Sequence, residues 1–165
     1  MINDMSTTDL VLRLVTAVLV GGLLGLNRDL HKKRAGLRTH ALVTLGAAMA
    51  TIAMLNGQMT DGSTNLDAVS RVLQGILTGI GFLGAGVILR DTEGHVTGLT
   101  TAATIWVSAV LGTLCGLGHW LLIGLSSLLI LGVLTVGGRL EKIAELVFKR
   151  SVDVQNENPN ENIES

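Results

Sequence analysis

The sequence of 165 residues has little charge for its length: only 15% of its residues are Asp, Glu, Lys or Arg, and the net charge is −1. A soluble domain needs about a quarter charged residues to cover its surface. The near-zero net charge also argues against binding to a nucleic acid, which a basic surface would favour. With 48% apolar residues, the composition instead favours residence in a lipid bilayer.

Several kinds of catalytic and metal-binding motif are also missing. The single cysteine, Cys115, excludes an intramolecular disulfide. The sequence contains no Walker A loop, no Cys/His set with zinc spacing and no nucleophile elbow. No acidic residue lies in the interior of an apolar run, so a set of oxygen ligands for a metal ion is hard to assemble. We therefore expect no enzyme, no bound metal and no cofactor.

Five apolar segments are long enough to cross a bilayer, which takes about 20 helical residues. They lie at about 9–27, 39–56, 70–89, 98–117 and 119–138. The first follows Asp4 and Asp9 rather than a basic stretch, unlike a cleavable signal peptide, so we expect it to be retained. The sequence predicts an all-α integral membrane protein with a five-transmembrane-helix bundle over residues 1–140. Residues 141–165 are expected to form a short cytoplasmic polar tail, largely disordered.

The basic residues are distributed unevenly. Ten of the twelve lie at 28–38, at Arg90 and at 139–150, directly after the first, third and fifth runs. Because Lys and Arg stay on the cytoplasmic side of a bacterial inner membrane, we expect the N-terminus outside and the C-terminus in the cytoplasm. The other two, Arg13 and Arg71, lie within or beside apolar runs, where a charge needs a reason. Arg13 is close enough to the end of its run to extend its side chain to the interface.

Glycine is frequent, with 21 residues, and is concentrated in the apolar runs. Small residues four apart let helix backbones approach closely in membranes. Pairs with this spacing are Gly21/Gly25, Gly75/Gly79 and Gly112/Gly116. The residues that we expect to pack closely against another helix, within the bundle or across a dimer, are Gly75, Gly79, Gly81, Gly84 and Gly86. The alternatives for this glycine-rich stretch are a break in the helix or backbone exposed to a ligand.

Polar side chains form stripes on two of the predicted helices. Asp67, Arg71 and Gln74 share one face of the third, and Asp67 and Arg71 have the spacing of an i, i+4 ion pair. In the fourth, Thr97, Thr101, Thr104 and Ser108 have the same spacing, and Thr100, Thr101 and Thr104 are assigned with the first three residues to a functional polar cluster. Polar groups in a membrane usually face the bundle interior, so we expect the two stripes to meet in a polar seam, as a structural clamp or as a functional site. Alternatively, the hydroxyls of the fourth helix bond carbonyls of the preceding turn.

The loop at 28–38 carries five cations and His31. One interpretation is an orientation signal that also binds anionic lipid. The other is a cytoplasmic site for an anion or a protein partner, with Gly36 allowing a turn. The residues assigned to this cytoplasmic basic motif are Arg28, Arg38 and Thr39.

Several of these stretches resemble the MgtC/SapB family of bacterial membrane proteins. The similar segments are 21–28, 35–43, the polar positions Asp67, Arg71 and Gln74 with 79–86, and 98–106, in the family's order. One departure is Asn27, because the family usually has a glutamate before the arginine that ends its first helix. Some members carry a soluble C-terminal domain; here only a short tail follows the last run, so regulation through such a domain is expected to be absent.

The resemblance implies a bacterial inner-membrane protein linked to growth at low magnesium, which modulates other membrane machinery, including ATP synthase. The competing function is an ion transporter or channel for magnesium, protons or phosphate that uses the polar seam. We expect its partners to be the lipid bilayer, a second copy in a homodimer and another membrane protein complex, with no nucleic acid.

Overall fold

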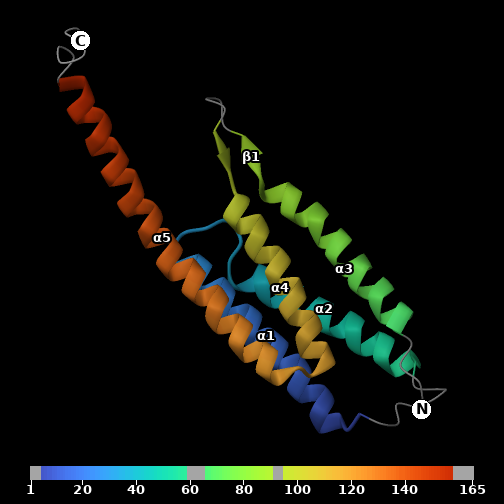
Figure 1. The fold of residues 1–165 in the computed structure, drawn as a ribbon. Helices are drawn as coiled ribbons and strands as arrows, with labels where there is room; N and C mark the ends of the chain where they lie inside the picture. Colours follow the sequence, from blue (N-terminus) through green and yellow to red (C-terminus); the bar gives the residue numbers. More distant parts are fainter. Residues whose placement is uncertain (1–4, 59–65, 91–94, 158–165) are drawn as a thin grey trace. The chain divides into compact units, whose positions relative to one another are not determined.

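The computed structural model describes the backbone of residues 5–58, 66–90 and 95–157, and the side chains in these ranges except at 57, 58, 66 and 139–157. Within them, the chain forms five helices and one hairpin (Figure 1): α1 (Thr7–Leu30), α2 (Leu37–Gln58), α3 (Leu66–Val87), β1 (Leu89–Arg90), β2 (Val96–Thr97), α4 (Leu99–Leu117) and α5 (Trp120–Glu157). The strands are antiparallel, with Leu89 opposite Thr97. The chain divides into two compact units, Met1–Ser127 and Leu128–Ser165, and α5 contributes to both.

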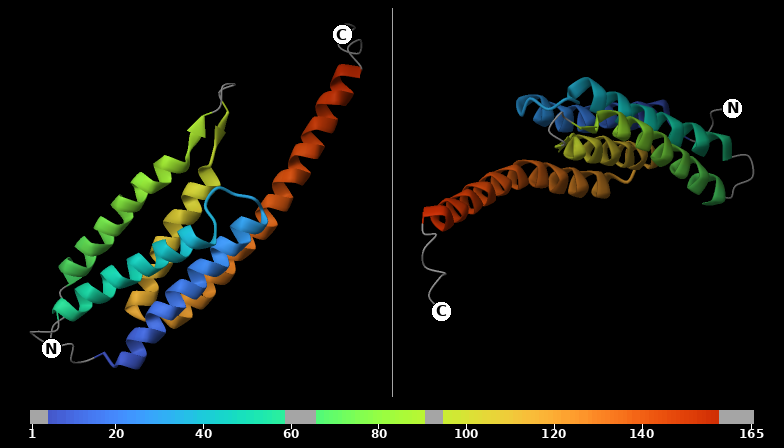
Figure 2. Two further views of the ribbon diagram at one scale, coloured as in Figure 1. Left: turned by 180° about the vertical axis from the view of Figure 1, so that it is seen from behind. Right: turned by 90° about the horizontal axis from the view of Figure 1, so that it is seen from above.

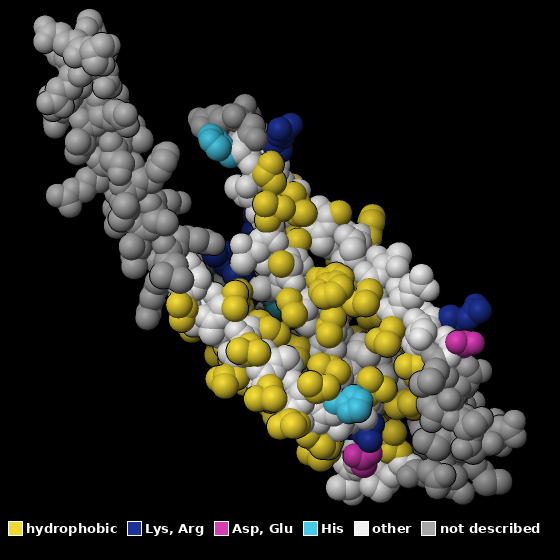
Figure 3. Space-filling view, in the orientation of Figure 1, with side chains coloured by type: hydrophobic (Ala, Val, Ile, Leu, Met, Phe, Trp, Pro, Cys, Tyr) yellow, Lys and Arg dark blue, Asp and Glu magenta, His cyan; other side chains and the backbone are white. Residues whose placement is uncertain are grey.

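Each of these helices contains a span that is long and apolar enough to cross a membrane. The spans are Thr7–Leu30, Leu37–Asn56, Asp67–Val87, Leu99–Leu117 and Trp120–Gly138. They agree with the five predicted runs to within a few residues. Apolar side chains are spread over the bundle in Figure 3, and Leu19 and Leu121 are 60% and 76% exposed. The protein is therefore an all-α integral membrane protein, as the sequence predicts.

Helices α1, α2 and α4 pack closely because glycines remove side chains from their interfaces. A Cβ on Gly25 of α1 would lie 2.6 Å from the Gly36 carbonyl oxygen and 2.7 Å from the Leu37 nitrogen. Gly21 of α1 faces Thr44 of α2 in the same way. On α4, a Cβ at Gly112 would lie 2.9 Å from Ala47 Cβ, and one at Gly116 would lie 2.8 Å from the Ala48 carbonyl oxygen. The predicted close packing is therefore confirmed for two of the three glycine pairs.

Helix α3 flanks this group and is far more exposed than α4. Of the residues in each span, 56% are buried in α4 but only 6% in α3. Seen from behind, α2 crosses over α4, and α3 flanks both (Figure 2). An apolar groove of about 400 Å³ lies between these three helices, lined on the α3 side by Gly75, Ile76, Gly79, Ile80 and Leu83.

The packing prediction for the α3 glycines needs correction. A Cβ at Gly84 would lie 3.6 Å from Ala102 Cβ of α4, which is ordinary contact. At Gly75, Gly79, Gly81 and Gly86 it would meet nothing within 4 Å in the described part of the chain. Gly75 and Gly79 line the apolar groove, which separates them from α2 and α4. Packing within the chain therefore holds for Gly84 alone; packing across a dimer stays a proposal for the other four.

The polar tail also differs from its prediction. Residues 141–157, expected to be largely disordered, continue α5 as helix, so the boundary between residues 140 and 141 falls inside one element. Between Glu141 and Glu157 the sequence has no proline or glycine, the two residues that most disfavour the interior of a helix. Residues 158–165 lie outside the described part.

Candidate functional site

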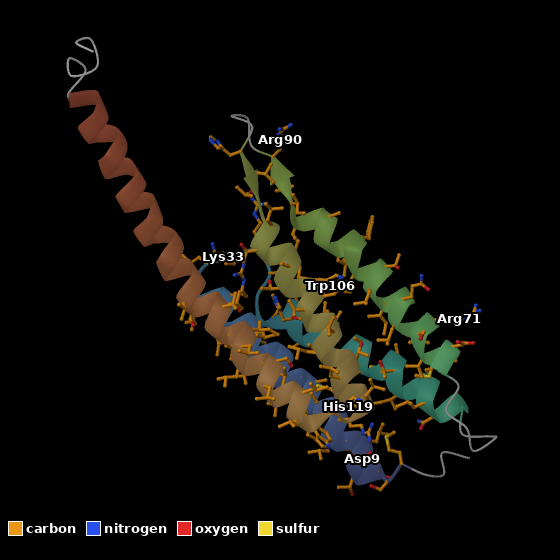
Figure 4. The ribbon with its side chains drawn as sticks, viewed as in Figure 1. Asp9, Lys33, Arg71, Arg90, Trp106 and His119 are labelled. Atoms are coloured by element: carbon orange, nitrogen blue, oxygen red, sulfur yellow. The ribbon has the colours of Figure 1, made fainter. Side chains whose placement is uncertain are left out.

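The predicted polar stripe of α3 lies on the outside of the described structure. The side chains of Asp67, Arg71 and Gln74 are exposed, and Arg71 is directed away from the other helices in Figure 4. These residues share a face, as their spacing predicts, but that face is not turned toward α4. The ion pair between Asp67 and Arg71 stays a prediction.

The polar stripe of α4 is divided between its buried and exposed sides. Thr101 and Thr104 are buried at 4% and 3% exposure, whereas Thr100 is exposed. The Thr104 hydroxyl donates to the Thr101 carbonyl at 2.8 Å, and the Ser108 hydroxyl donates to the Thr104 carbonyl at 2.8 Å. These two hydroxyls therefore bond the preceding turn, which was the alternative interpretation of the sequence.

The polar seam expected between α3 and α4 does not form, and the six residues assigned to it are not brought together. Toward α3, helix α4 presents Ala102, which meets Gly84. Thr101 instead meets α1, because its hydroxyl oxygen accepts a hydrogen bond from Arg28 Nη2 at 3.1 Å. Helical spacing shows which side chains share a face, but not which neighbour the face meets.

Arg28 is the buried charge of this region. It lies in the last turn of α1 and is only 4% exposed. A cation in the last turn is favoured by the helix dipole. Besides the bond from Nη2 to Thr101, its Nε is buried and has no hydrogen-bond partner among the described residues. A buried donor without a partner is unfavourable, so this guanidinium retains binding capacity.

A polar pocket of about 230 Å³ opens beside Arg28. Its walls come from the end of α1, the following loop, β2 and the start of α4, and its lining residues are Arg28, Lys32, Lys33, Arg34, Thr97, Gly98, Thr100 and Thr101. We call this the basic pocket. It is lined by four cations, three hydroxyls and a glycine, and no carboxylate lines it. Such a lining favours an anion and disfavours a metal cation.

The loop after α1 has a defined shape that keeps its one carboxylate away from this pocket. Asp29 Oδ2 accepts a hydrogen bond from the Leu37 backbone N–H at 2.9 Å, at the first turn of α2. A Cβ at Gly36 would meet the Asp29 carboxylate, so a larger residue there would require this side chain to shift. Lys32 turns the chain with a positive φ of 52°. Asp29 does not line the basic pocket.

The predicted basic motif is split by the structure. Arg28 is buried and lines the basic pocket, whereas Arg38 and Thr39 are exposed at the start of α2 and do not line it. The pocket is lined instead by Lys32, Lys33 and Arg34. These residues belong to the predicted basic loop but were not assigned to the motif. Sequence alone gave no signal to separate Arg34 from Arg38, because both are loop cations near Gly36.

His40 and Thr44 form a polar layer between α1 and α2 that sequence reasoning did not single out. His40 is fully buried; its Nδ1 lies 2.9 Å from the Gly36 carbonyl oxygen, and its Nε2 is buried without a partner among the described residues. The Thr44 hydroxyl donates to the Ala17 carbonyl of α1 at 2.7 Å. A histidine within an apolar run was the available signal.

Arg13 lies toward the opposite end of α1, and its expected extension to the interface stays a prediction. Its Nε lies 2.9 Å from Asp9 Oδ2 in an ion pair, and its Nη1 donates to the Gly116 carbonyl at 2.6 Å. The side chain is 16% exposed. A cation bonded to the last carbonyls of a helix stabilises that terminus, so Arg13 joins α1 to the end of α4. Among the described residues, no group of three His, Cys, Asp or Glu is placed to hold a metal ion.

Comparison with known proteins identifies the family. The sequence profile of the MgtC family matches residues 14–143, which include most of α1, all of α2 to α4 and the basic pocket. The chain belongs to the MgtC family. It is thus a bacterial membrane protein with the fold described above. No solved structure matches it.

Three relatives illustrate the extent of the similarity. SrpB of Synechococcus elongatus is 40% identical over 141 residues, which cover 81% of this chain and 78% of SrpB. MgtC of Salmonella typhimurium is 46% identical over 110 residues, covering 67% of this chain and 44% of MgtC. The Escherichia coli protein named "Putative magnesium transporter YhiD" is 38% identical over 117 residues, covering 69% of this chain and 54% of YhiD. This MgtC-family chain therefore spans about half the length of the last two.

Proposed function

We propose that this MgtC-family chain is a non-enzymatic protein of the bacterial inner membrane that supports growth at low magnesium by modulating other membrane machinery. The magnesium connection is supported by family membership and by the name of the relative YhiD. The chain contacts its partner through the exposed face of α3, which is formed by Arg71, Gln74 and Gly81.

The observation that carries this proposal is the exposure of α3. Polar side chains within a membrane usually face protein rather than lipid, yet Arg71 and Gln74 are exposed. Glycines within a membrane helix usually serve close approach of another helix, yet Gly79 and Gly81 meet nothing in the described chain. Phe82 beside them is 82% exposed. A second helix on this face would satisfy all these groups, and it would belong to a second copy of the chain or to another membrane protein.

Complementation with matched glycine variants tests this proposal. In a bacterium that lacks its own family member, Gly81→Leu should accumulate normally but fail to support growth at low magnesium. Gly22→Leu on α1 is the control, because a Cβ at Gly22 also meets nothing within 4 Å. Normal growth with Gly81→Leu would contradict a contact through α3. Cross-linking from Gln74→Cys, with Cys115 replaced by serine, would identify the partner as a second copy or another protein.

The proposed orientation is supported by the end of the bundle at which the basic loop lies. Lys33 and Arg90 lie at the end of the bundle where α1 ends and α4 begins, whereas Asp9 and His119 lie at the opposite end (Figure 4). The positive-inside rule puts the first end in the cytoplasm and the N-terminus outside. An impermeant maleimide added to intact cells should label Thr8→Cys but not Lys33→Cys; labelling of both would refute this orientation.

The competing function is an ion transporter or channel, which the name of YhiD favours for that relative. The purified protein would be reconstituted in liposomes, and the fluxes of magnesium, protons and phosphate would be measured. Flux above that of empty vesicles, with loss in Arg71→Ala, favours transport. Flux equal to that of empty vesicles favours modulation.

A further inference from the structure

We infer that the basic pocket binds a phosphate group, carried by a free phosphate compound or by a lipid headgroup. The pocket is formed by the end of α1, the loop after it, β2 and the start of α4. This pocket lies in a different part of the molecule from the exposed face of α3. The inference therefore goes beyond the proposed function and does not depend on it.

Arg28 provides the first argument. The residue is only 4% exposed, and it lines the pocket. Nη2 is bonded to the Thr101 hydroxyl, but Nε is buried without a partner among the described residues. A buried charge of this kind is stable when an opposite charge is close, and a planar guanidinium matches two oxygens of a phosphate. An oxyanion in the pocket would supply both the charge and the acceptor.

The start of α4 provides donors on another wall of the pocket. Gly98 precedes α4 with a left-handed φ of 94°, and no side chain caps the first turn. The first N–H groups of a helix have no partner within the helix, and they favour anions together with the helix dipole. Glycine is required at this point, because a Cβ on Gly98 would collide with the Val87 carbonyl. The Thr100 and Thr101 hydroxyls lie in the same turn.

The charge and size of the pocket select the ligand class. Lys32, Lys33 and Arg34 surround the pocket with Arg28, and Asp29 is engaged by the Leu37 N–H. The hydrogen-bond donors of the pocket come from α1, the loop and α4, and therefore from several directions. The oxygens of a tetrahedral anion also point in several directions, so such an anion fits these donors better than a single carboxylate does. A volume of about 230 Å³ accommodates a phosphate group with a few waters, each of which takes about 30 Å³ in the liquid.

Binding of inorganic phosphate is measured first, by calorimetry on the full chain in a phosphate-free maltoside detergent. The decisive pair is Arg34→Gln and Arg38→Gln: both residues are exposed loop cations, but only Arg34 lines the pocket. We expect Arg34→Gln to weaken binding about tenfold, the value of one charge-assisted hydrogen bond. Arg38→Gln should change affinity less than about twofold. Arg28→Lys retains the positive charge but loses the planar guanidinium that can donate two hydrogen bonds to one phosphate. This variant should weaken binding at least as much as Arg34→Gln.

A second measurement distinguishes the source of the phosphate group. Native mass spectrometry would count phosphatidylglycerol molecules retained by the same variants, with an uncharged glycolipid as control. Saturable inorganic phosphate binding with the expected variant order supports a free phosphate ligand. Retention of phosphatidylglycerol with that variant order, without inorganic phosphate binding, supports a lipid headgroup. Binding of neither ligand overturns the inference, and so does equal weakening by Arg34→Gln and Arg38→Gln, which would reflect loop charge alone.

Discussion

Helices α1 and α3 carry glycine pairs with the same spacing but in opposite environments. Gly21 and Gly25 of α1 meet the backbone and Thr44 of α2, whereas Gly75 and Gly79 of α3 meet nothing within 4 Å in the described chain. Their arginines differ in the same way: Arg13 is bonded to Asp9 and to α4, and Arg71 is exposed. A small-residue motif therefore permits close packing without specifying the partner. On α1 the partner is in the chain, and on α3 we propose that it is another polypeptide.

The largest difference in stability should appear when a glycine of each helix is replaced by leucine. Gly25→Leu forces side-chain atoms into the Gly36 and Leu37 backbone and should cost about 3 kcal/mol or more. Gly79→Leu projects into the open groove and should change stability by less than about 0.5 kcal/mol. A thiol-reactive fluorescent dye can follow unfolding of both variants, because the single cysteine, Cys115, is fully buried. Equal destabilisation would mean that α3 packs against its own chain as tightly as α1 does.

The arginines should differ by a smaller amount. Arg13→Gln removes the ion pair with Asp9 and the link to the Gly116 carbonyl, and it should destabilise by about 1.5–3 kcal/mol. Arg71→Gln removes an exposed charge and should stay within about 0.5 kcal/mol. Thermal unfolding in detergent at two salt concentrations would compare them. A loss with Arg71→Gln as large as that with Arg13→Gln would show that the α3 face is already satisfied within the monomer.

The smallest contrast concerns two threonines. Thr44→Val deletes the hydroxyl that bonds the Ala17 carbonyl across the α1–α2 interface, and it should cost about 0.6–1.7 kcal/mol, the range for such bonds in membranes. Thr78→Val on the exposed side of α3 should be nearly neutral, within about 0.5 kcal/mol. Unfolding midpoints in the same dye assay provide the measurement. A neutral Thr44→Val would indicate that packing of Gly21, rather than the hydroxyl, holds the two helices together.

The sequence could predict the five membrane spans because each needs only a sustained run of apolar residues. It could not predict which face of α3 turns inward, because lipid and protein interior are both apolar and the pattern does not distinguish them. The polar stripe at Arg71 and Gln74 was therefore assigned to the interior, although it is exposed. Arg28 was included in the basic motif, but its burial depends on the meeting of α1 with α4, which are far apart in the sequence.

The bond from Arg13 to the Gly116 carbonyl has a consequence for biosynthesis. The two residues are 103 positions apart, so the acceptor does not exist until α4 has been translated. Until then Arg13 has only Asp9, on its own helix, as a partner for its charge. The first helix thus enters the membrane with a cation whose second partner arrives late. Formation of this contact marks the moment at which the ends of α1 and α4 are joined.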